Sequence, residues 1–454
     1  MSPATPGTPA GSHAEAPRER DSGSAATGTT NPFGNSLGNG ETAGSGAPGR
    51  SHPGGRPGTD DHRAAGGRDS AGIDMLRIDD QLSPEEKLVR DTVREFAADR
   101  VLPHIAGWFE EGILPRELLP ELGKLGLLGM HLTGYGCAGM GPIAYGVACR
   151  ELEAVDSGLR SMVSVQGSLA MFPIWKYGSE EQKAEWLPKM AAGEAAGCFG
   201  LTEPDHGSDP GGMRTRAVRD GTGWVLSGSK MWITNGSVAD VAVVWAVTED
   251  GIRGFLVPRG TPGFTARDIH RKLALRASVT SELHFDDVRL PADAVLPGVT
   301  GLKGPLSCLT EARFGIIWGA TGAARTCYET AVEYARTREQ FGKPIGAFQL
   351  TQSKLAWMAA DLFRAQLLAL HLGRLKEAGT LTPAQVNLGK MACVRAAIDI
   401  ARQARTVLGA NGVTLEYPVI RHANNLEAVL TYEGTEEIQS LALGQAITGY
   451  SAYR

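Results

Sequence analysis

The 454-residue sequence has no apolar run of the length that a membrane-spanning helix needs. Its first residues lack the charged-then-apolar order of a secretory signal peptide. Residues 1–72 carry seven acidic residues against six arginines, which argues against an organelle transit peptide and against a basic nucleic-acid-binding arm. Neither a Walker A sequence nor an HExxH motif occurs. We therefore expect no membrane span and no nucleic-acid partner.

Closely spaced cysteine pairs are also missing. No two cysteines stand at CxxC spacing, and no histidines cluster near them. The six are Cys137, Cys149, Cys198, Cys308, Cys327 and Cys393. This pattern disfavours a disulfide framework and a zinc site. The sequence predicts a soluble protein of a reducing compartment, which we take to be the cytoplasm, with no bound metal.

Residues 1–72 contain only three large apolar side chains, those of Met1, Phe33 and Leu37, and a third of the segment is Gly or Pro. Such a segment cannot bury enough surface to offset the entropy of ordering, so we expect it to be disordered. A GxGxxG match at 44–49 lies within it. Because that match is not set between a strand and a helix, it does not indicate a dinucleotide-binding loop.

Helical patterns fill residues 76–195, which we interpret as an N-terminal helical domain. Ser83, Pro84 and Glu86 give the first helix an N-cap, a proline at N1 and a capping-box glutamate. Further helices are expected over 115–125, 141–155, 160–176 and 179–192.

The pattern changes over 196–300, where short apolar runs alternate with turn residues and predict a middle β domain. Helical period returns in 301–454. The expected helices there are 306–337, 347–377, 383–408, 417–430 and 436–448. Long helices joined by short loops suggest an antiparallel bundle. The predicted fold class is therefore mainly α with a central β domain.

Two runs in the middle region have the composition of a ligand site. Residues 198–209 are dense in small and hydroxyl residues, whose backbone N–H groups and hydroxyls suit a flat or phosphorylated ligand. The same composition also fits a turn-rich connector. Residues 230–236 place Trp232 and Thr234 just before a turn, and a buried core tryptophan is the alternative there.

A third run surrounds Glu433, which lies just before a helix with Thr435 as its N-cap. The positive end of that helix favours the ionised carboxylate, whereas burial favours the protonated form. This opposition is typical of a general base that works near neutral pH. A solvated, helix-capping glutamate is the alternative.

Taken together, these runs resemble the acyl-CoA dehydrogenase flavoproteins over residues 76–454. The matching motifs occur in the order of the family: GLTEP at 200–204 with GSD at 207–209, WIT at 232–234, REQFG at 338–342, LGANG at 408–412 and YEGT at 432–435. The resemblance implies an N-terminal helical domain, a middle domain like a β-barrel and a C-terminal four-helix bundle.

Within the family, the resemblance is closest to the glutaryl-CoA dehydrogenases. It is carried by residues 134–139, 150–158, 160–166, 275–278, 400–405 and 446–449. The glutaryl substrate has a distal carboxylate, for which a planar guanidinium is a suitable partner. The resemblance implies that Glu153, Arg160, Ser161 and Ser164 surround that carboxylate. A structural ion pair between Arg160 and Glu153 is the alternative.

The resemblance also implies the roles of further residues. Glu433 is the base that removes the α-proton, and the CoA thioester faces Ser208, Arg313 and Gly434. The cofactor is FAD, and the residues expected near its flavin are Phe199, Gly200, Leu201, Thr202, Ser208, Trp232, Ile233, Thr234, Thr435 and Glu437. Its adenine half is held from a neighbouring subunit by Arg338, Gln349, Val407, Leu408, Gly409 and Ala410.

The expected reaction is dehydrogenation of glutaryl-CoA with decarboxylation to crotonyl-CoA and CO2. The expected partners are an electron-transfer flavoprotein and three further copies of the chain in a homotetramer. The sequence departs from the glutaryl-CoA dehydrogenase pattern at Leu159, Glu311, Glu436, Glu437 and Gln445. Dehydrogenation of another short or carboxylated acyl thioester without decarboxylation is the alternative, and a non-catalytic flavin-binding protein is a third reading.

Overall fold

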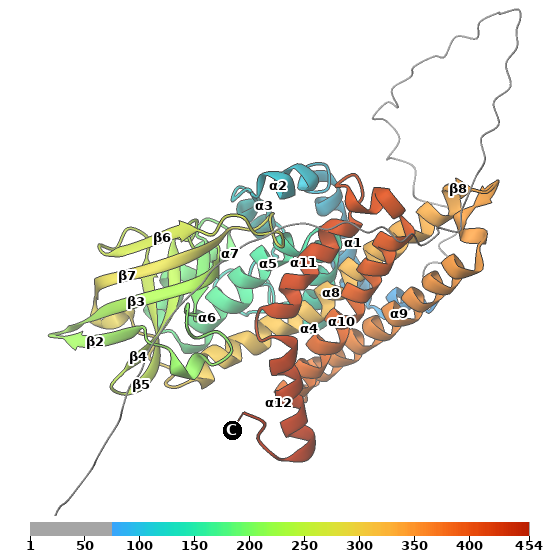
Figure 1. The fold of residues 1–454 in the computed structure, drawn as a ribbon. Helices are drawn as coiled ribbons and strands as arrows, with labels where there is room; N and C mark the ends of the chain where they lie inside the picture. The colour runs from blue at the N-terminus through green and yellow to red at the C-terminus, as the bar shows by residue number, and fades with distance from the viewer. Residues whose placement is uncertain (1–74, 454) are drawn as a thin grey trace, which may run out of the picture. The chain divides into compact units, whose positions relative to one another are not determined.

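The computed structural model describes residues 75–453, so the disorder predicted for 1–72 lies outside the described residues. The described chain runs from a helical region through a curled sheet into a second helical region, which confirms the predicted fold class (Figure 1). The first region contains α1 (Pro84–Arg100), α2 (Ile105–Glu111), α3 (Leu118–Lys124), α4 (Pro142–Val155), α5 (Ser157–Ser164), α6 (Phe172–Tyr177) and α7 (Glu180–Ala191).

Local sequence signals explain where these helices begin. The Ser83 hydroxyl accepts from the Glu86 N–H and the Glu86 carboxylate accepts from the Ser83 N–H, which is the predicted capping box. The single helix predicted for 160–176 is wrong in detail, because α5 is followed by a π-helix over Val165–Met171 and then by α6. The short helix α2 has no side-chain cap and was not predicted.

The middle region forms one curled seven-stranded sheet. Its strands are β1 (Gly197–Gly200), β2 (Arg216–Asp220), β3 (Gly223–Thr234), β4 (Val241–Thr248), β5 (Gly251–Pro258), β6 (Phe264–Asp268) and β7 (Thr280–Leu290). The order is β1-β4-β2-β3-β7-β6, and β5 pairs with β4. Strand β1 runs parallel to β4, whereas β3 and β7 are antiparallel with a register shift between Lys230 and Ile233.

The C-terminal helices are α8 (Lys303–Thr337), α9 (Gln349–Glu377), α10 (Pro383–Val407), α11 (Val419–Thr431) and α12 (Glu436–Thr448). They begin and end within three residues of the predicted bounds. A small hairpin of β8 (Glu339–Gln340) and β9 (Lys343–Pro344) joins α8 to α9. One hydrophobic core joins α4 and α5 to α8, α9, α10 and α11, so the two helical regions pack together.

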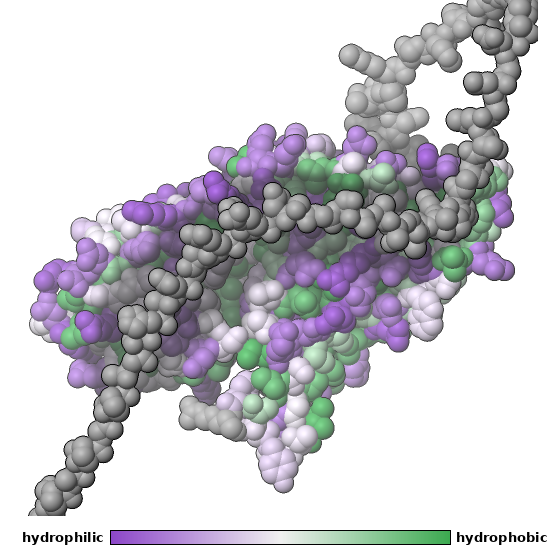
Figure 2. All heavy atoms as spheres, in the orientation of Figure 1, coloured by the Kyte–Doolittle hydropathy of each residue, from purple (hydrophilic) through white to green (hydrophobic). Residues whose placement is uncertain are grey.

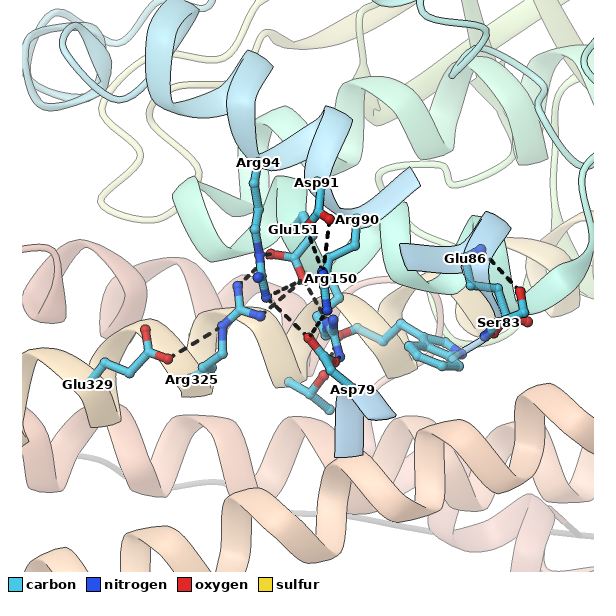
Figure 3. Close-up of polar contacts among 12 residues, drawn as sticks. Asp79, Ser83, Glu86, Arg90, Asp91, Arg94, Arg150, Glu151, Arg325 and Glu329 are labelled. Atoms are coloured by element: carbon cyan, nitrogen blue, oxygen red, sulfur yellow. Dashed lines mark hydrogen bonds and ion pairs between the residues drawn. The ribbon is translucent and has the colours of Figure 1, made fainter. Parts of the chain in front are cut away.

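A buried network of charges also fastens the N-terminal helices to α8 (Figure 3). The Glu151 carboxylate on α4 accepts from Arg94 on α1 and from Arg150, and it forms a 2.6 Å ion pair with Arg325 on α8. Arg150 in turn reaches Asp79 at 2.8 Å. Since each buried charge has a partner of opposite sign, the network keeps α4 and α8 in one relative position.

Candidate active site

Glu433 lies in the short connection between α11 and α12. Its backbone has a φ of +53°, which is uncommon for a residue other than glycine, and Gly434 follows at +91°. The Thr435 hydroxyl accepts from the Ile438 N–H and begins α12, as predicted. The connection therefore turns sharply at Glu433 and presents its side chain between two helix ends.

Three side chains, of which those of Lys390 and Gln439 are buried, hold the carbonyl oxygens of this turn. Arg313 on α8 donates to the Glu433 oxygen at 2.7 Å, and Gln439 on α12 donates to the same oxygen at 3.2 Å. Lys390 on α10 donates to the Gly434 oxygen at 2.5 Å and also contacts the Tyr432 oxygen. The strained turn is thus fixed from three helices.

The Glu433 carboxyl lies in an environment that opposes its ionisation. Its Oε2 atom is buried and has no hydrogen-bond partner among the described residues. Burial raises the pKa of Glu433, while the positive charges of Arg160, Lys390 and Arg313 act in the opposite direction without cancelling the rise. A raised pKa and an unpaired oxygen are features of a general base that awaits a proton donor.

Arg160 on α5 is the cation near Glu433 that is the candidate for binding a substrate carboxylate. Only 1% of the residue is exposed, and its Nε donates to Glu153 at 2.6 Å. Its guanidinium also contacts the Tyr432 hydroxyl, which lies 3.5 Å from the Ser161 hydroxyl. Ser164 is fully buried one turn further along α5. The structure therefore contains the Arg160–Glu153 ion pair and places Arg160 beside the residue that precedes Glu433.

The predicted flavin loop and the end of β3 lie next to each other. The Met231 N–H donates to the Thr202 oxygen at 2.8 Å. The buried Lys230 ammonium donates to the Leu201 oxygen at 3.0 Å and to the Glu203 carboxylate at 2.8 Å. The backbone N–H groups of residues 214 and 215 complete the shell around Glu203. A buried ion pair thus fixes the loop after β1.

Trp232 occupies the register shift of β3 and is 56% exposed with a φ of +63°. The alternative of a buried core tryptophan is therefore wrong. An exposed indole on a strained bulge, beside the backbone of residues 200–202 and the half-exposed Thr234, fits a flat aromatic ligand. Phe199 and Ile233 are buried beneath this surface, while Ser208 is exposed on the loop. These residues can hold the flavin of FAD.

The residues expected at the adenine half lie elsewhere. Arg338 and Gln349 flank the β8–β9 hairpin, and both are exposed. Residues 407–410 span the end of α10 and the turn after it, and the nearby Asn411 donates to Tyr334 on α8 at 3.0 Å. Helix α8 begins where Gly304 meets Trp245 of the sheet, and its 35 residues extend roughly 50 Å to this hairpin (Figure 1). One chain does not bring both halves of the expected site together.

Several residues of the site were missed by sequence reasoning. Lys390, Gln439 and Tyr432 surround the turn at Glu433, and Lys230 and Glu203 fix the flavin loop. Glu203 and Tyr432 lie within the GLTEP and YEGT motifs and Lys230 lies within the run 230–236, but sequence reasoning gave them no role. Lys390 and Gln439 lie outside every motif, and the one signal for Lys390 was a lysine in an otherwise apolar helical pattern.

Two other classes of feature are not found in residues 75–453. No group of three or more His, Cys, Asp or Glu side chains is placed to hold a metal ion there. Within the same range, none of the helices has the length and apolar character needed to cross a membrane.

Comparisons with known proteins cover nearly all of the described chain. Residues 83–194, 198–288 and 300–448 match the N-terminal, middle and C-terminal domains of acyl-CoA dehydrogenases, respectively. The human mitochondrial short-chain specific acyl-CoA dehydrogenase is 38% identical over 379 residues, which are 82% of this chain and 92% of that protein.

Two solved structures are more similar. A crystal structure of glutaryl-CoA dehydrogenase from Mycobacterium smegmatis is 66% identical with a TM-score of 0.83, and the match covers 84% of this chain and 99% of that chain. A second one from the same organism, in complex with FADH2, is 61% identical with a TM-score of 0.84. It covers 85% of this chain and 100% of that chain.

Proposed function

Because the chain belongs to the acyl-CoA dehydrogenase family, we propose that it oxidises glutaryl-CoA with FAD as its cofactor and releases crotonyl-CoA and CO2. The enzyme class is that of an acyl-CoA dehydrogenase, an oxidoreductase. The substrate assignment draws on identities of 61% and 66% to two glutaryl-CoA dehydrogenases.

One observation carries the substrate assignment, the buried guanidinium of Arg160 beside Tyr432. A buried cation is costly, and a plain fatty acyl chain offers nothing to compensate it. A distal carboxylate does, through charge-assisted hydrogen bonds. Glu153 keeps the guanidinium oriented through Nε, while Ser161 and Ser164 lie on the same helix.

In the proposed reaction Glu433 accepts the α-proton of the acyl thioester. Bound FAD supplies the acceptor for the β-hydride, so a carbon–carbon double bond forms. The pKa of Glu433 is raised by burial, and this makes the carboxylate a better proton acceptor than an exposed one. Ser208, Arg313 and Gly434 would face the thioester. A backbone N–H at the turn would hydrogen-bond the thioester carbonyl and stabilise the negative charge that develops there.

Decarboxylation then follows from the position of the distal carboxylate. After oxidation the bond to this carboxylate is one carbon from the new double bond. Its cleavage releases CO2 and leaves an electron pair that is delocalised into the unsaturated thioester. Protonation of the γ-carbon completes crotonyl-CoA. Arg160 would hold the carboxylate during oxidation and orient it for this cleavage.

Further assignments belong to the same proposal. The electrons pass to an electron-transfer flavoprotein, and four chains assemble through the C-terminal bundle. Exposed apolar side chains on α12, Leu441 and Ile447, give that region a surface suited to contact another chain (Figure 2).

The domain bounds 76–195, 196–300 and 301–454 are proposed as the units of the fold. The free cysteines are in keeping with the cytoplasm.

A second candidate is dehydrogenation of a short acyl-CoA without decarboxylation. It is favoured by the similarity to the short-chain specific enzymes and by the Glu153 carboxylate, which already compensates Arg160. In this case Arg160 is a structural residue of the pocket wall.

Anaerobic titration separates these functions. The purified holoenzyme is mixed with glutaryl-CoA or butyryl-CoA, the flavin absorbance is followed, and the products are identified by mass spectrometry. We expect faster bleaching by glutaryl-CoA, with crotonyl-CoA as product. Accumulation of glutaconyl-CoA, or faster bleaching by butyryl-CoA, would support the second candidate. No bleaching by any acyl-CoA would leave a non-catalytic flavoprotein.

A further inference from the structure

Lys390 is a buried cation that forms no ion pair within residues 75–453. Only 2% of the residue is exposed, and its ammonium donates to the backbone oxygens of Tyr432 and Gly434. Burying a charge without a carboxylate bound to it is strongly unfavourable. A neutral side chain could fill the same place, so the charge itself needs an explanation.

The geometry of the turn at Glu433 gives one reason for a lysine at position 390. In a trans peptide the N–H points away from the C=O of the same unit. Because the Tyr432 oxygen points to Lys390, the Glu433 N–H points to the opposite side of that peptide. The lysine therefore fixes the direction of the donor that a thioester carbonyl would meet.

The charges around Glu433 give a second reason for a lysine at position 390. Arg160 from α5, Arg313 from α8 and Lys390 from α10 are the cations that act on its carboxyl. Glu153 from α4 opposes them, and Tyr432 adds a neutral hydroxyl close to Arg160. Arg160 is paired with the Glu153 carboxylate, whereas Arg313 and Lys390 donate only to backbone or amide oxygens within residues 75–453. Of these two, Lys390 is the more deeply buried cation.

We propose that Lys390 is a positioning residue for Glu433, which both aims the Glu433 N–H and keeps the Glu433 carboxyl ionised at the pH of catalysis. The proposal rests on the assignment of Glu433 as the base. Burial lowers the pKa of Lys390 to about 7, so its positive charge is fully present only below neutral pH. This is the range in which Glu433 would otherwise take up a proton.

Two substitutions separate the effect of the Lys390 charge from the effect of the hydrogen bonds to the carbonyl oxygens of the turn. Lys390→Gln removes the charge and keeps a donor for the carbonyl oxygens. Gln439→Leu removes the hydrogen bonds to the Glu433 and Gly434 oxygens without changing any charge. Lys390→Arg keeps the charge and serves if Lys390→Gln does not yield holoenzyme. Lys124→Gln, on the exposed end of α3, is the matched surface control.

The measurement is the pH profile of kcat/KM for flavin reduction, whose acid limb reports the base of the free enzyme. In Lys390→Gln we expect the limb to move to higher pH by about 1 unit or more. In Gln439→Leu and Lys390→Arg we expect a lower kcat while the acid limb stays at the wild-type pH. In Lys124→Gln we expect neither kcat nor the acid limb to change. The protonated-carboxyl band of Glu433, identified by its absence in Glu433→Gln, should follow the same shift in infrared difference spectra.

An unmoved acid limb in Lys390→Gln, in a variant that retains FAD and melts like the wild type, would overturn the proposal. An equal shift in Gln439→Leu would do the same, because the charge would then not be the cause. If the wild-type enzyme reduces its flavin normally while these outcomes occur, only the role of Lys390 fails. If no acyl-CoA reduces the wild-type flavin, the proposed function itself fails.

Discussion

Glu433 combines three properties that seldom occur in one glutamate: a positive φ, a buried unpaired oxygen and a raised pKa. Strain of this kind persists only where the surroundings enforce it, and here Arg313, Lys390 and Gln439 hold the neighbouring carbonyl oxygens. A helix-capping glutamate in solvent would need none of these contacts. These features favour the proposed role of Glu433 as a base over a helix-capping role.

The first prediction concerns this side chain directly. Glu433→Gln keeps the shape of the residue and removes the proton acceptor. We expect the purified variant to retain FAD while the rate of flavin reduction by glutaryl-CoA falls at least about 100-fold, the lower range for loss of a general base. Stopped-flow absorbance measures the rate. A colourless variant would show instead that the residue is needed for the cofactor site.

The second prediction concerns the specificity of Arg160. Loss of a charge-assisted hydrogen bond of about 1.5–3 kcal/mol corresponds to about 10–150-fold in kcat/KM. We expect Arg160→Ala to lose this factor with glutaryl-CoA and little with butyryl-CoA, so that the ratio of the two kcat/KM values falls.

The control for Arg160→Ala takes account of Glu153, the ion-pair partner of Arg160. Removing Arg160 leaves the Glu153 carboxylate buried without its countercharge, which destabilises the fold. The double variant Glu153→Gln, Arg160→Ala removes both charges and should show the same change in substrate preference. Equal losses with both substrates in both variants would identify Arg160 as a structural residue.

At the level of elements, the ion pair between Lys230 on β3 and Glu203 joins the flavin loop to the sheet. Burial raises the pKa of Glu203, but hydrogen bonds from backbone N–H groups and from Lys230 outweigh burial and lower the pKa to about 2. Burial also lowers the pKa of Lys230 to about 8. The pair is thus ionised at neutral pH and holds the loop where the flavin is expected.

The third prediction follows from the lowered pKa of Glu203. A carboxylate whose folded pKa is depressed stabilises the fold above its unfolded pKa, and this stability is lost as the pH falls through the folded value. We expect Glu203→Gln to lower the melting temperature and the FAD content at pH 7. The difference from wild type should shrink between pH 4.5 and pH 2. Thermal melts across this range measure it.

The exposed Asp205 on the same loop provides the control. Its ion pair with Arg214 lies on the surface, so Asp205→Asn should change stability by less than about 0.5 kcal/mol. If Asp205→Asn destabilised the protein as much as Glu203→Gln, the loop would be held by its surface contacts and not by the buried pair.

Elements with strong local signals could be predicted from the sequence. The capping box at Ser83 and the N-cap at Thr435 determine helix starts through neighbouring residues alone, and both are present. The π-helix over Val165–Met171 could not be predicted, because its hydrogen-bond pattern is set by packing against β1 rather than by residue type. Lys390 was missed for a similar reason, since its carbonyl partners are more than forty positions away.

At the scale of the whole molecule, the candidate site is divided between two ends of the bundle. Glu433 and Trp232 belong to regions near the sheet, whereas Arg338, Gln349 and residues 407–410 lie around the far end of α8. If all of them bind one FAD, as we propose, the second group must come from another chain. Exposed Phe341 in the turn of the hairpin and exposed Leu350 at the start of α9 are suited to such a contact.

The fourth prediction tests this division by mixing subunits. Glu433→Gln and Arg338→Ala chains are each expected to give inactive or weakly active enzyme. In a mixed assembly, an Arg338→Ala chain contributes an intact Glu433 and a Glu433→Gln chain contributes an intact Arg338. We expect co-refolding to restore activity to roughly a quarter of wild type by statistical pairing at a two-fold interface. No recovery would place both residues in one subunit's site.

The central claim is that this enzyme uses Arg160 to hold a substrate carboxylate, which is lost as CO2. The most direct measurement is a single anaerobic turnover with glutaryl-CoA labelled at the distal carboxyl carbon, in which labelled CO2 is compared with the amount of flavin reduced. The account predicts equal amounts of the two. Flavin reduction with the label retained in glutaconyl-CoA would contradict it.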